Sequence, residues 1–255
     1  VTDANGCTTT SSTTISVAGN VLTGFTYNGN QCLTGNSFVF SNTGTTGETY
    51  SWDFGDGAGT SFLENPAYSY SAPGNYTVQQ TIINGVCSET TTLNVSVYPE
   101  PTLAQTLTNP SCNGDVDGMV DIVVSGGTPN YTYNWSNGTT NQNLTGVAAG
   151  PYNVTVSDIN NCQVDGAYIL SDPSLFTVST SHNNSFCQTV CDGDATAVGA
   201  GGTAPYSYSW DDPSNQTVDN AVGLCEGTYV VTATDANGCV STSSEAVITT
   251  SPIDL

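Results

Sequence analysis

Tyr50-Ser51-Trp52, Tyr133-Asn134-Trp135 and Tyr208-Ser209-Trp210 are three copies of one short pattern, and they hold the only tryptophans of this 255-residue chain. Successive side chains of a β-strand point to opposite faces, so each copy places its Tyr and its Trp on one face. A Gly-x-Tyr-x-Val stretch with the same alternation follows each copy, beginning at Gly74, Gly150 and Gly227. The sequence therefore predicts one aromatic core that is used three times.

Six aromatic side chains are expected to lie in these cores, because large aromatics dominate core burial. They are Trp52, Tyr76, Trp135, Tyr152, Trp210 and Tyr229. A Trp on a central strand that faces a Tyr on a later strand is typical of the immunoglobulin-like sandwich, although no Cys follows these Tyr residues by two positions. Val, Ile, Tyr and Thr are plentiful, and no window shows helical periodicity. We therefore expect an all-β chain of tandem immunoglobulin-like β-sandwich domains.

The charge of the chain is one-sided, with 22 acidic residues, no Lys, no Arg and one His. No side chain can neutralise phosphates, which argues against a nucleic-acid partner. No apolar run is long enough for membrane insertion. Without cationic partners, the carboxylates must be solvated, hydrogen-bonded to the backbone or bound to metal. A solvated surface suited to salty water is the simplest interpretation, with specific calcium sites or drift in composition as alternatives.

The nine cysteines indicate an oxidising compartment. The first Cys of each unit precedes its Trp by 20, 23 and 23 residues, and the last Cys follows the Tyr of Gly-x-Tyr-x-Val by 11, 10 and 10 residues. This spacing predicts one long disulfide within each unit and an additional bridge in the last one: Cys32–Cys87, Cys112–Cys162, Cys187–Cys239 and Cys191–Cys225. Each long bridge would close a loop of about 50 residues and contribute roughly 4 kcal/mol of stability.

The ninth cysteine, Cys7, lies in a stretch that is repeated near the end of the chain. Thr2-Asp3-Ala4-Asn5-Gly6-Cys7 recurs as Thr234-Asp235-Ala236-Asn237-Gly238-Cys239. Residues 1–18 are therefore expected to be the C-terminal strands of a preceding repeat, and the chain to be an excerpt from a longer protein. Residues 252–255 would begin the next linker. A free reactive thiol at Cys7 is the competing interpretation.

Residues 19–99 carry a longer motif. It consists of Tyr50-Ser51-Trp52-Asp53-Phe54-Gly55-Asp56-Gly57, then Asn65-Pro66, and then Pro73-Gly74-Asn75-Tyr76-Thr77-Val78. The motif resembles the polycystic-kidney-disease (PKD) type domain. The resemblance implies an immunoglobulin-like β-sandwich of extracellular modular proteins, usually a spacer or an adhesion module. The family commonly has His where this chain has Tyr68, and we expect this difference to be structural only.

Residues 100–173 and 174–251 form a tandem repeat. Positions from Cys112 to Trp135 recur 75 residues later, and positions from Gly150 to Cys162 recur 77 residues later. Runs such as Tyr131-Thr132-Tyr133-Asn134-Trp135-Ser136-Asn137-Gly138 resemble the SprB-type repeats of very large gliding-motility adhesins on the surface of Bacteroidota. The second copy departs from the pattern after Trp210 and in its additional cysteine pair. The resemblance implies type IX secretion and a place on an extracellular cell-surface filament.

Paired carboxylates in turns make calcium the one cofactor to consider. Asp53 and Asp56 lie in a Gly-rich turn, where carboxylates commonly cap backbone N–H groups but can also offer oxygen ligands to calcium. The remaining candidates are Asp115 and Asp117 in one repeat and Asp192 and Asp194 in the other. No full Asp-x-Asp-x-Asp-Gly pattern with a downstream Glu is present, so a structural turn is the first interpretation.

The residue types argue against an enzyme. One His near a linker, no Lys and cysteines that are expected to pair leave no acyl-transfer triad and no Schiff-base chemistry. We expect a structural and adhesive segment of a large secreted cell-surface repeat protein. A carbohydrate- or ligand-binding module is the alternative, and an accessory domain of an extracellular hydrolase is a third possibility.

Short proline-containing linkers at Pro99-Glu100-Pro101, Asp172-Pro173 and Ser251-Pro252 separate these acidic units. Proline restricts its own backbone and that of its predecessor. Stiff linkers between like-charged domains predict an extended array. Its expected partners are neighbouring repeats of the same chain, a surface polysaccharide or other surface ligand, and further chains in lateral self-association into a fibre.

Overall fold

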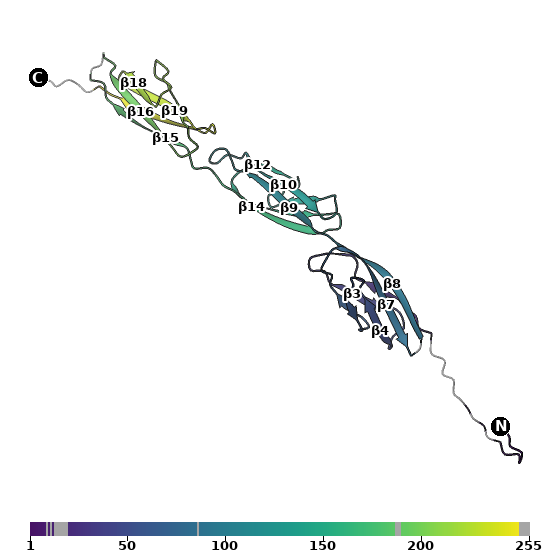
Figure 1. Ribbon diagram of the computed structural model, residues 1–255. Coiled ribbons are helices and arrows are strands. Elements are labelled where there is room, and N and C mark those ends of the chain that lie inside the picture. The colour runs from purple at the N-terminus through teal and green to yellow at the C-terminus, as the bar shows by residue number, and fades with distance from the viewer. Residues whose placement is uncertain (9, 11, 13–19, 86, 187–189, 250–255) are drawn as a thin grey trace. The chain divides into compact units, whose positions relative to one another are not determined.

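A computed structural model describes residues 1–8, 10, 12, 20–85, 87–186 and 190–249. Within these ranges the chain is all-β, as expected, and holds no helix. By internal contacts, residues 1–102, 126–131 and 157–163 form one compact unit, and residues 103–125, 132–156 and 164–255 form a second. The strands group into three sandwiches, each made of two sheets (Figure 1).

The first sandwich pairs a small sheet with a larger one. The small sheet has the order β1-β3-β6 and consists of β1 (Phe25–Tyr27), β3 (Phe38–Asn42) and β6 (Ala67–Tyr68). The larger sheet has the order β2-β8-β7-β4-β5 and consists of β2 (Gln31–Cys32), β4 (Thr49–Asp53), β5 (Thr60–Ser61), β7 (Gly74–Asn84) and β8 (Cys87–Tyr98). β2 pairs in parallel with the end of β8, whereas the other pairs of this sandwich are antiparallel.

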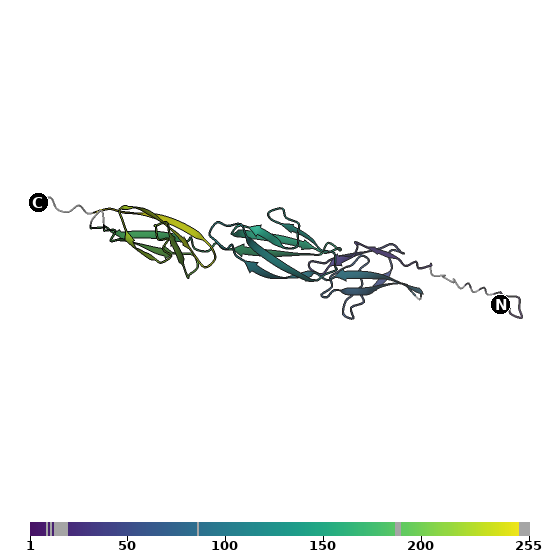
Figure 2. The same ribbon diagram turned by 90° about the horizontal axis from the view of Figure 1, so that it is seen from above.

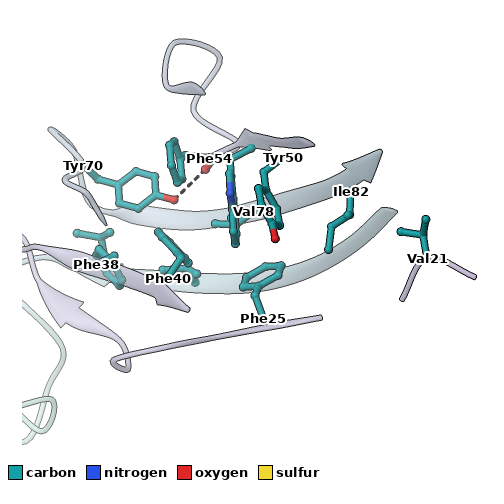
Figure 3. Close-up of a cluster of buried hydrophobic side chains, with 12 residues drawn as sticks. Val21, Phe25, Phe38, Phe40, Tyr50, Phe54, Tyr70, Val78 and Ile82 are labelled. Atoms are coloured by element: carbon teal, nitrogen blue, oxygen red, sulfur yellow. Dashed lines mark hydrogen bonds between the residues drawn. The ribbon is translucent and has the colours of Figure 1, made fainter. Parts of the chain in front are cut away.

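Aromatic side chains fill the space between these two sheets (Figure 3). Phe38 and Phe40 come from the small sheet and are fully buried, and Phe40 packs against Trp52 with ring centroids 5.7 Å apart. Tyr70 reaches into the same core, where its hydroxyl donates a hydrogen bond to the Phe54 carbonyl at 2.8 Å. The alternating burial of β3 and β4 confirms the two-residue period on which the sandwich was predicted.

The second and third sandwiches have the same strand order. In the second, the sheets are β12-β10-β9 and β11-β13-β14, formed by β9 (Pro101–Thr108), β10 (Gly118–Gly126), β11 (Thr132–Trp135), β12 (Leu144–Val147), β13 (Gly150–Ser157) and β14 (Gln163–Leu170). In the third, they are β15-β16-β18 and β17-β19-β20, formed by β15 (Thr177–Asn183), β16 (Gly193–Ala200), β17 (Ser207–Trp210), β18 (Asn220–Leu224), β19 (Gly227–Thr234) and β20 (Val240–Val247). Figure 2 shows the same strands from above.

The three tryptophans occupy equivalent places. Trp52, Trp135 and Trp210 are almost fully buried on β4, β11 and β17. Each indole N–H donates to a backbone carbonyl of the segment that follows its strand, at Leu63, Asn141 and Val218, over 2.8 to 3.0 Å. Burial of the polar indole N–H therefore leaves no donor unpaired. The prediction that these residues form the core is confirmed.

The three predicted core tyrosines share a second role. The hydroxyls of Tyr76, Tyr152 and Tyr229 each donate to a backbone carbonyl four residues upstream, at Ala72, Ala148 and Cys225. This is the tyrosine-corner arrangement of immunoglobulin-like sandwiches. Tyr229 is buried, whereas Tyr76 and Tyr152 are only half-buried, so the prediction that these two lie in the core is met only in part.

Several predictions fall on residues outside the described ranges. They concern Cys187, the strands expected within residues 13–18, and the linker expected over residues 252–255. The predicted domain boundaries therefore stay predictions. Over the described residues, no helix has the length and hydropathy that crossing a bilayer requires.

Candidate functional site

Two of the three disulfides join cysteines of different sandwiches, which corrects the predicted pairing. Cys32 of the first sandwich is bonded to Cys162, and Cys112 of the second is bonded to Cys239. The predicted bridges Cys32–Cys87 and Cys112–Cys162 are therefore wrong, and Cys239 does not take the partner assigned to it. Cys191–Cys225 is confirmed. Among the described cysteines, Cys7 and Cys87 are free.

Strand geometry explains why Cys32 cannot reach Cys87. Cys32 lies opposite Tyr98 in the β2–β8 pair, whereas Cys87 is the first residue of β8. At about 3.3 Å per residue, the two ends of β8 lie about 35 Å apart. A disulfide requires the two Cα atoms to lie within about 7 Å of each other. The first and last cysteines of this sandwich therefore face its opposite ends.

The third sandwich follows the same rule. β16 begins at Gly193, next to the Cys191–Cys225 bridge, and ends at Ala200. The loop that carries Cys239 is attached beyond the other end of β16, where Asp235 accepts a hydrogen bond from the Thr203 N–H at 2.8 Å. The last cysteine of the repeat is thus a full strand length away from the cysteine at the start of β16. The first and last cysteines have regular sequence spacings to the Trp and Tyr of one core, but they do not lie close together in space.

Cys162 and Cys239 are each presented by a short loop built around one Asp. We call Asp158–Cys162 and Asp235–Cys239 the last-cysteine loops. In both, the Asp Oδ1 accepts from the N–H two residues on and from the Cys N–H four residues on, at 2.8 to 2.9 Å. The Oδ2 atoms accept from the Thr128 and Thr203 N–H groups at 2.8 Å. These hydrogen bonds hold the backbone of Cys162 and Cys239 in place.

Asp158 and Asp235 were not among the predicted site residues. The signal was present, because the two residues recur 77 positions apart beside the recurring cysteines. Burial would by itself raise the pKa of Asp235, but the N–H donors of Thr203, Cys239 and Asn237 outweigh it and hold the pKa below its usual value. The ionised carboxylate is therefore the form that the loop requires.

Cys32 and Cys112 each lie in a loop that is tied to the following linker by a carboxylate. We call Cys32–Gly35 and Cys112–Asp115 the first-cysteine loops. Two residues after Cys32, Thr34 donates its N–H and its hydroxyl to Glu100 at 2.8 and 2.6 Å. Two residues after Cys112, the Gly114 N–H donates to Asp172 at 3.2 Å. Glu100 and Asp172 directly precede the linker prolines Pro101 and Pro173, so each junction combines a disulfide with a carboxylate tie.

The carboxylates considered as calcium ligands accept hydrogen bonds within turns or, for Asp194, across the β15–β16 strand pair. Asp53 accepts from the Gly55 N–H and Asp117 accepts from Ser111, while Asp115 lies 3.4 Å from the Ser111 hydroxyl. In the third sandwich, Asp192 accepts from the Ser185 hydroxyl and Asp194 from the Asn183 amide. Within the described part of the chain, no three His, Cys, Asp or Glu side chains are grouped so that they could hold a metal ion. Calcium binding stays a prediction, which an unchanged thermal midpoint after chelator treatment would contradict.

Asp56 has a partner of its own. It accepts from the Tyr68 hydroxyl and from the N–H groups of Ala58 and Gly59, and the Tyr68 ring stacks on Phe54 with centroids 4.1 Å apart. The Tyr68 bond is the largest cause of the lowered pKa of Asp56, and the same bond, with burial, raises the pKa of Tyr68 to about 12. The residue at which the chain differs from the family thus closes the predicted turn.

A hollow of about 480 Å³ lies beside the Cys112–Cys239 bridge. Its walls are formed by Asn109, Pro110, Ser111, Ser171, Asp172, Pro173 and Asn237, and Asp172 is the only titratable residue among them. Asp172 already accepts the Gly114 N–H. Asp172 is therefore the one carboxylate of this wall, and the wall itself holds no pair of carboxylates for acid–base chemistry.

Comparison with known families agrees with the sequence motifs. The family described as PKD domain matches residues 28–97, and the family described as SprB repeat matches residues 104–140 and 180–215. Both are families of structural domains. Together with the disulfides, they indicate an extracellular surface protein. No curated protein matches the chain.

Solved structures with a similar fold are tandem immunoglobulin-like domains. The N-terminal eight Ig domains of Down syndrome cell adhesion molecule are 12% identical and match 90% of this chain and 37% of that one, with a TM-score of 0.52. The I67–I69 I-band fragment of titin is 12% identical and matches 89% of this chain and 99% of that one, with a TM-score of 0.40. The full ectodomain of mouse nectin-like molecule 4 is 11% identical over 89% and 98%, with a TM-score of 0.41. At these identities the likeness concerns the fold alone.

Proposed function

We propose that this chain, which contains a PKD domain followed by two SprB repeats, is a structural and adhesive segment of a large secreted cell-surface protein. In that protein, the segment transmits tension. In this proposal the segment belongs to a gliding-motility type of adhesin filament, exported by type IX secretion. Its partners are neighbouring repeats and a surface polysaccharide, and it performs no catalysis.

The observation that carries the proposal is that disulfides connect successive sandwiches. A bridge within a sandwich protects only that sandwich, whereas Cys32–Cys162 passes tension from the first sandwich directly into the second. From Cys162, tension can reach Cys239 by two routes. One runs back to Cys112 and across its bridge, and the other runs forward and across Cys191–Cys225.

The consequence is a strict limit on extension. Cys32 and Cys239 are 207 positions apart in the chain. A fully extended chain spans at most 3.3 to 3.6 Å per residue, so without bridges this segment could stretch to about 700 Å. With all three bridges, the shortest covalent route from Cys32 to Cys239 crosses the Cys32–Cys162 and Cys191–Cys225 bridges. Its chain segments are the 29 positions from Cys162 to Cys191 and the 14 positions from Cys225 to Cys239. That route is about 150 Å long when extended.

The proposal is tested by stretching single molecules between handles at residues 20 and 249. We expect the oxidised chain to gain far less length than the reduced chain, by about 550 Å, when every sandwich unfolds. Cys32→Ser should lengthen the shortest route to the 80 positions between Cys32 and Cys112, about 270 Å.

The matched control is Cys191→Ser, which leaves the route through Cys112–Cys239. That route contains 50 positions, so its length should change little. Equal extension of the oxidised and reduced chains would contradict a role in tension. The adhesive part is tested separately, by the retention of beads coated with the chain on surfaces coated with polysaccharide.

A further inference from the structure

Cys87 occupies the place in the first sandwich that Cys162 and Cys239 occupy in the other two. The three tryptophan-containing sheets have the matching orders β4-β7-β8, β11-β13-β14 and β17-β19-β20. In each, the middle strand begins with Gly-x-Tyr-x-Val and the third strand begins at or directly after the cysteine. The three cysteines are therefore equivalent by topology as well as by spacing.

Both described equivalents of Cys87 are bonded to the same kind of partner. Cys162 is bonded to the first cysteine of the preceding sandwich, Cys32, and Cys239 is bonded to the first cysteine of its own preceding sandwich, Cys112. Cys87 is the free member of this series, and it is half-buried rather than enclosed in the core. Two occupied copies of one position thus identify the partner that the third copy would take.

The location of Cys87 fits this partner. Cys32 marks the end of β8 at which the first sandwich is bonded to the second, and Cys87 marks the other end. The β7–β8 turn differs from the last-cysteine loops, since Cys87 pairs directly with Asn84 across the hairpin and no Asp loop precedes it. In the first sandwich, the pairing with Asn84 holds the backbone of Cys87, a role that the Asp has in the last-cysteine loops.

We propose that Cys87 is the attachment site for the first-cysteine loop of a further SprB-type repeat placed directly upstream of the first sandwich. The two thiols would be joined by thiol–disulfide exchange with a small disulfide such as oxidised glutathione. One thiolate attacks the small disulfide and releases one reduced thiol, and the second thiolate then attacks the mixed disulfide and releases the other. The two protein thiols are oxidised and one small disulfide is reduced to two thiols.

Cys7 provides an internal control. Asp3 accepts from the Asn5 and Cys7 N–H groups at 3.0 and 2.9 Å, as in the last-cysteine loops. By the same rule, Cys7 would be bonded one sandwich further upstream than the partner of Cys87. The inference does not depend on the adhesive function, because it concerns only the order in which sandwiches are bonded.

The test is a fusion chain in which a second copy of residues 100–155 precedes Val1 of the whole chain. At this joint Val1-Thr2-Asp3 continues the added repeat where Val156-Ser157-Asp158 would stand. After oxidation with a glutathione buffer, pepsin peptides are mapped without reduction. We expect Cys87 bonded to Cys112 of the added copy, and Cys7 still open to alkylation. The same fusion with Cys112→Ser in the added copy should leave Cys87 fully alkylated.

Folding of the added repeat is monitored by the blue-shifted emission of its buried Trp135. In a second fusion, residues 100–173 are joined directly to residue 20, which removes Cys7 and changes the joint. If the joint of the first fusion prevents folding, the second fusion still tests whether Cys87 is bonded to the added Cys112. A folded added repeat with Cys87 still alkylated would overturn the proposal. A bond from the added Cys112 to Cys7, or from Cys87 to Cys32, would overturn it as well.

Discussion

Glu100 accepts two hydrogen bonds from Thr34, one from the backbone N–H at 2.8 Å and one from the hydroxyl at 2.6 Å. Thr34 follows Cys32 by two residues and Glu100 precedes the linker proline, so this pair connects the loop of one disulfide to the chain that enters the next repeat. Gly114 and Asp172 repeat the relationship at the next junction. The junctions are therefore built from sequence-distant pairs as well as from disulfides.

Replacement of Glu100 by Ala should loosen the Cys32 loop without unfolding the sandwich. A single hydrogen bond to a charged group contributes about 1.5 to 3 kcal/mol when sheltered, and exposure reduces this to about 1 kcal/mol. We expect the Thr34 amide to exchange its hydrogen several-fold faster, as measured by hydrogen–deuterium exchange. Glu89→Ala, an exposed carboxylate on β8, is the control. Unchanged exchange at Thr34 would show that the tie carries no free energy.

The acid stability of the third sandwich should depend on Asp235. Its pKa in the folded chain lies below the ordinary value of 3.8, so it stabilises the fold above that pH, and the contribution is lost as the pH falls through the lowered pKa. Asp235→Asn removes the charge but keeps a hydrogen-bond acceptor. We expect the variant to be less stable at neutral pH and to lose less stability below pH 3.8, as measured by denaturant unfolding at several pH values. Parallel pH profiles would contradict this role.

The hydroxyl of Tyr68 should ionise late. Its bond to Asp56 and its burial raise the pKa from 10.0 to about 12, so it stabilises the first sandwich fully below pH 10 and less as the pH rises toward 12. Tyrosinate absorbance of the chain and of Tyr68→Phe should therefore differ by one group that titrates near pH 12. The same variant should raise the pKa of Asp56, which carbon NMR of the carboxyl group can follow. A difference spectrum that titrates near pH 10 would be the contrary result.

Trp135→Phe should cost the second sandwich about 2 to 3 kcal/mol, from a smaller ring in a full core and a carbonyl at Asn141 that loses its donor. Thermal unfolding followed by circular dichroism gives this value. Phe62→Ala is the control, since Phe62 is 74% exposed and its removal should have little effect. A loss below about 1 kcal/mol for Trp135→Phe would show that the indole bond is not needed.

Local patterns in the amino-acid sequence were enough to predict the strands, the three cores and the repeat. The two-residue alternation around Trp52, Trp135 and Trp210 depends only on strand geometry, which acts locally and is visible in a few consecutive residues. The 75-residue recurrence between the last two units likewise needs no knowledge of the fold. The core tyrosines were predicted from the same stretches, but the half-burial of Tyr76 and Tyr152 and the hydrogen bonds of their hydroxyls were not.

The pairing of the cysteines, in contrast, depends on the order and direction of the strands in space. Equal spacing to a shared core made Cys112 and Cys162 look like partners, but spacing along a chain does not state at which end of a sandwich a loop emerges. The strand order places first and last cysteines at opposite ends, so Cys32 and Cys112 are bonded to the last cysteine of a neighbouring sandwich. A disulfide forms between atoms that meet in space, and in a sandwich that meeting is set by strand direction and sheet order rather than by sequence distance.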